Sequence, residues 1–231
     1  MLRTSSRFKL QYISDIHLEH RTIIPRIPAK TNYLALLGDI GHPNKPLYSE
    51  FLKYCSKNWD KVILLSGNHE YMQPKYSMKD IDDMIQSNVN KYPNITYLNN
   101  QKLILDNHLI LGTTLWSDST KTAPGHKIND LYYDSLQWLK GNIKQNTNKD
   151  IVVLTHYLPS YKLIIPKYHG YKTKFQYASN LDHLIKRPVK AWLCGHSHCQ
   201  LEKYINGVYC GINTLGYPHE NNNAKFFYYE E

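Results

Sequence analysis

A continuous apolar run that stops abruptly at polar residues occupies positions 62–69 of the chain: Val62-Ile63-Leu64-Leu65-Ser66-Gly67-Asn68-His69. Four consecutive apolar residues followed by turn formers are typical of a strand that is buried on both faces. Similar runs end in polar residues at 8–17, 33–39, 151–156 and 191–198. Because both faces of such strands must be covered by other layers, the pattern points to an α/β fold.

Apolar residues at helical spacing lie between these runs, around 47–55, 81–89, 132–143 and 181–185, and Pro188 ends the last of them. Ser77 is a plausible N-cap for the second of these helices. Other strand-like runs follow one another without a helix, at 95–98, 102–105, 108–111, 207–212 and 225–229. The sequence therefore predicts an α/β core with a mixed sheet or two stacked sheets. A length of 231 residues suits one domain, and we expect a single domain over residues 1–231.

Polar side chains gather where the apolar runs end: Asp15, His17, Asp39, Asn68, His69, His156, His196 and His198. The carboxyl ends of strands in open α/β sheets meet at one crevice, so these side chains should lie together. Without a cation such crowding would be costly, whereas carboxylate, amide oxygen and neutral imidazole all bind divalent ions well. The donors are too many for one tetrahedral zinc and include no thiolate, which predicts two ions roughly 3.5–4 Å apart that share a carboxylate. Such a pair would lower the pKa of a bridging water, giving hydroxide near neutral pH, and would clamp a phosphoryl group.

Each motif has an ordinary structural interpretation when taken alone. Gly38-Asp39 is a common turn, Gly67-Asn68-His69-Glu70 could start a helix, and His156 could be a hydrogen-bonded core histidine. Only the combination is specific, since all five motifs occur in one order and each stands at a strand end.

The ordered set Asp15-x-His17, Gly38-Asp39, Gly67-Asn68-His69-Glu70, His156 and Gly195-His196-x-His198 resembles the calcineurin-like metallophosphoesterase superfamily. The resemblance spans residues 15–198 and implies a four-layer α/β/β/α sandwich, with two mixed β-sheets flanked by helices and a dinuclear metal site at the strand ends. It implies that Asp39 bridges two ions, one bound by Asp15, His17 and His198 and the other by Asn68, His156 and His196. It also implies that His69 binds no metal but protonates the leaving oxygen of the substrate.

One position departs from the superfamily pattern. The motif Gly-Asp-x-x-Asp or Asn ends in a residue that orients the catalytic histidine, and here His42 stands in that place. A protonated His42 would depress the pKa of His69, so His42 should either stay neutral and accept a hydrogen bond or turn towards the substrate.

Several neighbouring residues have both a functional and a structural interpretation. Besides His42, Tyr157 and Trp116 are candidates for substrate contacts, although each could equally pack in the core. We expect Glu19 and His20 to be solvated loop residues, and Glu70 to support the ligands without binding metal. A basic and aromatic stretch is either a nucleotide or nucleic-acid contact or, more simply, a solvated loop; it comprises Lys162, Lys167, Lys172 and Lys174 with Tyr161, Tyr168 and Tyr171.

Composition limits the class of protein and its partners. The formal charge of +9 favours anionic partners, such as a phosphoester substrate, a nucleotide among them, or nucleic acid. No run approaches the roughly 18 apolar residues of a membrane span, and no apolar segment of a signal peptide follows Met1. We therefore expect no membrane association, a cytoplasmic location and four reduced cysteines.

Three functions are consistent with these residues. The first is a metal-dependent phosphoester hydrolase, the second a phosphodiesterase or nuclease acting on cyclic nucleotides or nucleic acid, and the third a catalytically weak metal-binding scaffold. Mn²⁺ is the expected metal, but Fe, Zn and Ni also suit the mixed nitrogen and oxygen donors. The sequence leaves open the substrate, the choice between monoester and diester, and the oligomeric state.

Overall fold

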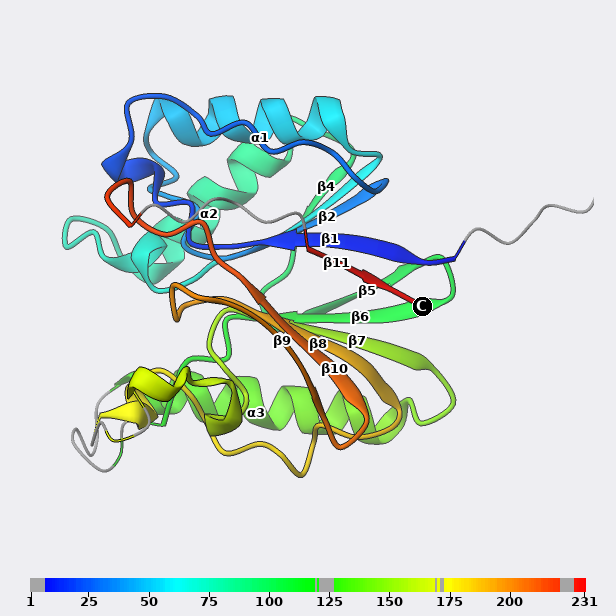
Figure 1. The fold of residues 1–231 in the computed structure, drawn as a ribbon. Helices are drawn as coiled ribbons and strands as arrows, with labels where there is room; N and C mark the ends of the chain where they lie inside the picture. Colours follow the sequence, from blue (N-terminus) through cyan, green and yellow to red (C-terminus); the bar gives the residue numbers. More distant parts are fainter. Residues whose placement is uncertain (1–6, 119, 121–126, 169, 171–172, 221–226) are drawn as a thin grey trace, which may run out of the picture.

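Two mixed β-sheets lie face to face at the centre of the computed structural model (Figure 1). The structure describes residues 7–118, 120, 127–168, 170, 173–220 and 227–231. The first sheet has the strand order β11-β1-β2-β3-β4, in which only β11 is antiparallel to its neighbour. Its strands are β1 (Lys9–Ile13), β2 (Tyr33–Leu37), β3 (Lys61–Leu65), β4 (Ile95–Tyr97) and β11 (Tyr228–Glu230).

The second sheet has the order β5-β6-β7-β8-β10-β9. Its four central strands are parallel, and the edge strands β5 and β9 are antiparallel to their neighbours. The strands are β5 (Gln101–Leu105), β6 (His108–Thr113), β7 (Asp150–Thr155), β8 (Val189–Cys194), β9 (Gln200–Ile205) and β10 (Val208–Asn213).

Helices cover the outer faces of both sheets. The first sheet carries α1 (Pro46–Asn58) and α2 (Met78–Val89), and the second carries α3 (Lys127–Gln145), as Figure 1 shows at its top and bottom. Ser77 caps α2 by accepting a hydrogen bond from the Asp80 backbone amide, and the Asp80 side chain accepts one from the Ser77 backbone amide. Short 3₁₀ helices lie in the loops: η1 (Leu18–His20), η2 (His69–Tyr71), η3 (Tyr161–Leu163), η4 (Pro166–Tyr168) and η5 (Lys174–Gln176).

Three apolar layers separate the four layers of secondary structure. One lies between the sheets and includes Leu10, Leu37 and Leu154. The second packs α1 and α2 on the first sheet, and the third packs α3 on the second sheet. This arrangement confirms the predicted sandwich of two mixed sheets flanked by helices, because strands with two apolar faces are buried on both sides.

Two elements differ from the sequence-based expectation. The segment 181–185 forms turns instead of a fourth helix, although Leu181 and Ile185 are buried as expected. The amide of Asn206 donates hydrogen bonds to the backbone carbonyls of Asp182 and Ile185, which fixes the turns in place. Strand β9 was not predicted, because as a mostly exposed edge strand it has no continuous apolar run.

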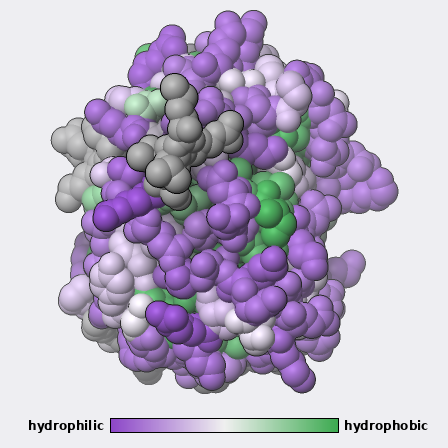
Figure 2. Space-filling view, turned by 90° about the vertical axis from the view of Figure 1, so that its right-hand side faces the viewer, coloured by the Kyte–Doolittle hydropathy of each residue, from purple (hydrophilic) through white to green (hydrophobic). Residues whose placement is uncertain are grey.

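The parallel strands direct their carboxyl ends towards one edge of the sandwich, on the left of Figure 1. The two sheets meet there through a bridge between Ser14, after β1, and Thr214, after β10. Figure 2 shows the side that carries the C-terminus, which is largely hydrophilic with scattered apolar residues. Among the described residues, no helix combines the length and the apolar character that crossing a membrane requires.

Candidate metal centre

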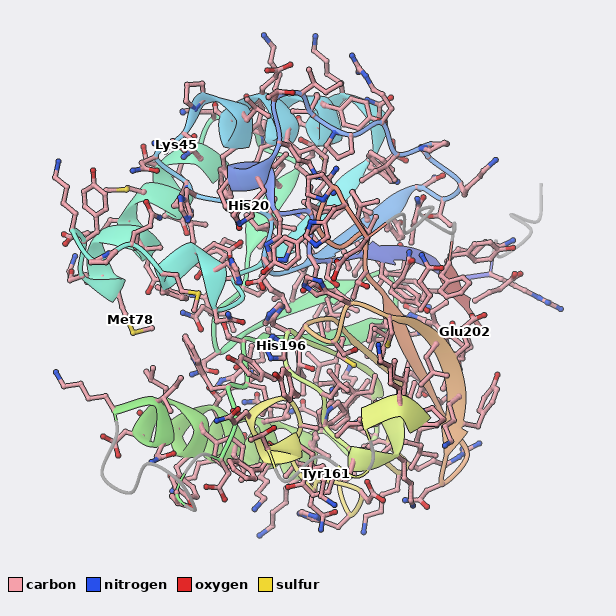
Figure 3. All side chains as sticks on the ribbon, turned by 60° about the vertical axis from the view of Figure 1, so that its left-hand side comes forward. His20, Lys45, Met78, Tyr161, His196 and Glu202 are labelled. Atoms are coloured by element: carbon pink, nitrogen blue, oxygen red, sulfur yellow. The ribbon has the colours of Figure 1, made fainter. Side chains whose placement is uncertain are left out.

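Five loops bring the polar side chains together at this edge. Asp15 and His17 follow β1, Asp39 follows β2, Asn68 and His69 follow β3, His156 follows β7, and His196 and His198 follow β8. Figure 3 looks onto the edge, with His196 between the two halves of the molecule and His20 on the side of the first sheet. The site is thus built from segments of both sheets.

The backbone adopts the left-handed conformation at five of these positions. The φ angles are 54° at Asp15, 50° at His17, 53° at Asp39, 66° at His196 and 46° at His198. Such angles are uncommon for residues with a side chain, although aspartate and histidine are enriched among the exceptions. They take the chain out of the regular strand just where the polar side chains turn inward.

Two glycines allow the loops to approach one another. A Cβ at Gly67 would meet Asp39 Oδ1 and lie 2.7 Å from His156 Cε1. A Cβ at Gly195 would meet Ser14 Oγ and lie 2.8 Å from Asp15 Oδ2. A side chain at either position would push the polar groups apart.

Asp15, His17 and His198 form one half of the centre, called here the first half-site. The Nε2 atoms of His17 and His198 lie 3.0 Å apart, and Asp15 Oδ1 lies 3.4 Å from His198 Nε2 and 4.0 Å from His17 Nε2. The side chains of Asp15 and His17 are fully buried. Three donor atoms therefore face one small volume.

Asn68, His156 and His196 form the other half, called here the second half-site. His156 Nε2 lies 3.2 Å from Asn68 Oδ1 and 3.2 Å from His196 Nδ1. Asp39 stands between the half-sites, since its Oδ2 lies 3.3 Å from His156 Nε2 and 4.0 Å from His17 Nε2. The sequence-predicted donors are thus brought together in two groups around one carboxylate.

The donor set fits divalent cations. Asp15 Oδ1 is buried and has no hydrogen-bond partner among the described residues, which is costly unless a cation neutralises it. Ring nitrogens of two histidine pairs face each other at 3.0–3.2 Å, where a shared ion would satisfy both lone pairs. Asp15, His17 and His198 form one group with metal-ligand spacing, and Asp39, His156 and His196 form another.

The pKa values of the metal-free site also indicate that its carboxylates need positive charge nearby. Burial alone would lower the pKa of His156, but Asp39 and Asp15 outweigh it and raise this pKa to about 9. Burial is likewise outweighed at His198, where Asp15 and Glu220 raise the pKa to about 9. Burial and the neighbouring His156 lower the pKa of His196 to about 3. Without a cation, protons therefore supply the positive charge that the carboxylates need.

Glutamate side chains support the first half-site from behind. His17 Nδ1 and His69 Nδ1 lie 2.9 Å and 3.1 Å from Glu19 Oε1, and His198 Nδ1 lies 2.7 Å from Glu220 Oε2. A carboxylate behind a ligating histidine fixes its tautomer and raises its basicity. The expectation that Glu19 is a solvated loop residue is therefore wrong, because its side chain is only 7% exposed and contacts two histidines. His20, in contrast, is 53% exposed, as expected.

Backbone groups support the second half-site. His156 Nδ1 lies 2.8 Å from the carbonyl oxygen of Leu37, to which it can donate a hydrogen bond. The buried Glu70 accepts hydrogen bonds from the backbone of Asp39, Ile40 and Gly67, at 3.1, 2.7 and 2.8 Å. Glu70 thereby joins the loops after β2 and β3, and burial together with Asp39 raises its pKa to about 7.

His69 lies at the edge of the centre, beside a cavity. Burial would lower its pKa, but the hydrogen bond to Glu19 and the charge of Asp39 outweigh it and raise the pKa above its usual value. Its Nε2 lies 3.3 Å from the hydroxyl of Tyr217, whose ring stacks on His17 with the centroids 4.3 Å apart. His42 is half-buried, and burial lowers its pKa. The hydrogen-bond partner of His69 Nδ1 is thus Glu19 and not the residue at position 42.

Tyr157 and Trp116 pack beneath the centre. Tyr157 is 5% exposed, and its ring centroid lies 4.1 Å from that of His196. Trp116 is 7% exposed and packs between Tyr71 and Tyr157. Neither side chain, nor that of His42, lines the cavity beside the centre. Their packing agrees with the structural alternative considered for Tyr157 and Trp116.

The chain is similar to known proteins both in sequence and in structure. The chain is 29% identical to protein L509 of Acanthamoeba polyphaga mimivirus, over an alignment of 267 residues that covers 95% of each chain. Its structure is similar to that of phosphopantetheinyl hydrolase from Mycobacterium tuberculosis, with a TM-score of 0.71, 14% identity, and coverage of 96% of this chain and 95% of that one. It also resembles a putative 5′-nucleotidase from Staphylococcus aureus, with a TM-score of 0.52, 14% identity, and coverage of 90% and 48%.

The family model of the calcineurin-like phosphoesterases matches residues 9–200, which include every donor of the two half-sites. Members of this family are metal-dependent phosphoester hydrolases. The chain therefore belongs to the calcineurin-like phosphoesterases.

Proposed function

We propose that this protein hydrolyses phosphoesters with two divalent cations, Mn²⁺ by preference, held by the first and second half-sites and joined by Asp39. The observation that carries the proposal is the position of Asp39 Oδ2, within 4.0 Å of His17 Nε2 on one side and 3.3 Å from His156 Nε2 on the other. Two divalent cations held by these residues would lower the pKa of a water molecule and neutralise charge on the phosphoryl oxygens.

His69 supplies the proton for the leaving oxygen in this proposal. Glu19 accepts the hydrogen bond from Nδ1, which orients the ring and leaves Nε2 on the side of Tyr217 and the cavity. A proton on Nε2 can therefore pass to an alkoxide that departs into the cavity. Glu19 is a positioning residue here. Its negative charge stabilises the protonated form of His69, whereas a protonated His42 would destabilise it.

Tyr217 limits the freedom of both His17 and His69. Its ring stacks on His17, and its hydroxyl lies within hydrogen-bond distance of His69 Nε2. In the substrate complex this hydroxyl would compete for, or share, the proton that His69 donates. Tyr217 therefore belongs to the residues that set the position of the leaving group.

The likeness to a phosphopantetheinyl hydrolase and to a putative 5′-nucleotidase agrees with a phosphoester substrate. The test begins with chelator-treated protein, assayed on p-nitrophenyl phosphate and bis-p-nitrophenyl phosphate before and after Mn²⁺ is restored. We expect turnover to return only with the metal. The proposal would be refuted if the metal-restored protein hydrolysed neither of the two esters and no nucleotide.

The role of His69 is tested separately with His69→Asn. We expect kcat on alkyl phosphates to fall by a factor of about 10²–10⁴, the usual contribution of a general acid, while the metal content stays at the wild-type level. Metal content is measured by plasma mass spectrometry of the same sample. Loss of metal in this variant would show that His69 is a ligand and not the proton donor.

A further inference from the structure

A cavity of about 410 Å³ opens beside the metal centre. Asp39, Asn68 and His196 contribute donors of the centre to its floor, and His69 lies at the same side. One water molecule occupies about 30 Å³ in the liquid, so the cavity holds far more than a phosphate group. Its size is that of a site for a small organic molecule.

Part of the cavity wall comes from the segment between β7 and β8. Ile164 and Ile165 line the cavity there, and both pack against the core layer beneath α3. Tyr177 lies beside them and is 46% exposed, with its ring centroid 5.5 Å from that of His196. An apolar wall with one accessible aromatic ring suits a flat apolar group next to the phosphate.

The backbone holds this wall in place. The amide of Leu158, two residues after His156, donates a hydrogen bond to the carbonyl of Tyr177, and the amide of Ser179 donates one to the carbonyl of Leu158. Tyr177 is thereby fixed to the same strand exit that presents His156 to the metals. The backbone at Tyr177 is therefore held beside the metal ligand before substrate binds.

A positive charge stands at the same wall. Lys174 is the only lysine or arginine among the described residues that line the cavity, and Asp39 is their only carboxylate. The ammonium group of Lys174 lies over the ring of Tyr161, 5.2 Å from its centroid. Figure 3 shows Tyr161 below His196, on the segment that forms the wall. The cavity therefore has cationic character at two places: the metal centre and Lys174.

We propose that this cavity takes a nucleotide with two separate phosphate groups, one at the metal centre and one at Lys174, with its base against Tyr177 and the two isoleucines. The inference rests on the proposed function, since it assigns the substrate class of that site. A monophosphate of a plain sugar would leave both the apolar wall and Lys174 unused. A simple aromatic phosphate would leave only Lys174 unused.

The test compares three ligands that differ by one group at a time: ribose 5-phosphate, adenosine 5′-monophosphate and adenosine 3′,5′-bisphosphate. Binding is measured by calorimetry in metal-loaded protein that carries His69→Asn, so that turnover does not interfere. We expect the base to improve the dissociation constant about ten-fold, as stacking on an aromatic side chain does. The second phosphate should improve it about five-fold, in line with a charge-assisted contact at an exposed site.

Single substitutions assign each gain to its residue. Tyr177→Ala should abolish the gain from the base and keep the gain from the second phosphate, and Lys174→Ala should do the reverse. Lys167→Ala, on the same segment but outside the cavity lining, and Tyr204→Ala, on the exposed edge strand β9, are the matched controls and should change neither gain. Equal affinity for the three ligands, or gains that survive both substitutions, would overturn the inference.

Failure of this inference is distinguishable from failure of the proposed function. Wild-type protein that hydrolyses p-nitrophenyl phosphate but binds the three ligands equally would retain its function and lose this substrate class. Protein that hydrolyses nothing would lose the proposed function, while calorimetry would still decide whether the cavity distinguishes the three ligands.

Discussion

The two half-sites hold similar donors but are supported differently. In the first half-site, carboxylates stand behind both histidines, Glu19 behind His17 and Glu220 behind His198. In the second, a backbone carbonyl stands behind His156, and Glu70 contacts backbone amides instead of the ligands. The first half-site therefore carries more negative charge around its ligands, and the second relies on rigid backbone.

This difference also decides which half-site is coupled to the proton donor. Glu19 contacts His17 and His69 with the same oxygen atom, Oε1. A cation at the first half-site and a proton on His69 thus act on one carboxylate, so the state of each affects the other. The second half-site is linked to His69 differently: Asp39, which lies beside His156, accepts a hydrogen bond from the backbone amide of His69 and not from its ring.

The largest expected effect comes from changing Asp39, the residue that both half-sites share. Asp39→Asn takes away the charge between His17 and His156, and we expect metal content to fall at both half-sites. Activity should drop at least about a thousand-fold, because several kcal/mol of charge stabilisation is lost. Plasma mass spectrometry and steady-state kinetics measure the two effects. Two ions per chain in this variant would mean that Asp39 is not the bridge.

The next experiment separates the two roles of Glu19. Glu19→Gln keeps the shape of the side chain but removes the charge shared by His17 and His69, and should slow hydrolysis of an alkyl phosphate about 100-fold. Hydrolysis of p-nitrophenyl phosphate, whose leaving group needs little protonation, should slow about ten-fold or less. A purely structural role for Glu19 would lower both rates by the same factor.

Glu220→Gln is the matched substitution on the same half-site. Glu220 contacts His198 but not His69, so we expect about ten-fold weaker binding of one of the two ions and no dependence on the leaving group. Metal titration followed by the recovery of activity measures this. If the alkyl phosphate were affected more than the p-nitrophenyl ester, the distinction between Glu19 and Glu220 would fail.

The last experiment concerns the metal-free protein. The pKa values of His156 and His198 are about 9, above the usual 6.5, so the stabilisation from their protonated forms is complete below pH 6.5 and is lost as the pH rises through 9. The loss for His156 is at most about 3 kcal/mol. Thermal melts of chelator-treated protein should show Tm falling between pH 6.5 and 9, and metal-loaded protein should not. A flat profile in both forms would contradict the assigned charges.

The sequence predicted the parts of this molecule that depend on local pattern. Apolar runs that stop at polar residues located the strand ends, and the ordering of five such motifs led to the donors that the structure brings together. Glu19 was misjudged, because its contact with His69 crosses 50 residues and depends on the turn of η1. The nearby position of Glu19, two residues after His17, was the only available signal.

Other features had no signal at all in the sequence. Glu220 follows β10 in a loop without periodicity, and its contact with His198 depends on where that loop folds back. Ile164 and Ile165 lie within the basic and aromatic stretch, for which the sequence left open a solvated loop or a nucleotide or nucleic-acid contact, and Tyr177 lies three residues beyond it. Tyr171 and Lys172 of that basic and aromatic stretch lie outside the described residues.

The left-handed backbone at Asp15, His17, Asp39, His196 and His198 has a consequence for anyone who would transplant this centre. Each such conformation disfavours folding by about 1 kcal/mol, and five together approach the whole stability of a small domain. A borrowed scaffold would need three well-packed apolar layers to tolerate them. On ordinary strand ends, the backbone at these five positions would relax into the extended conformation. The five side chains would then point away from one another.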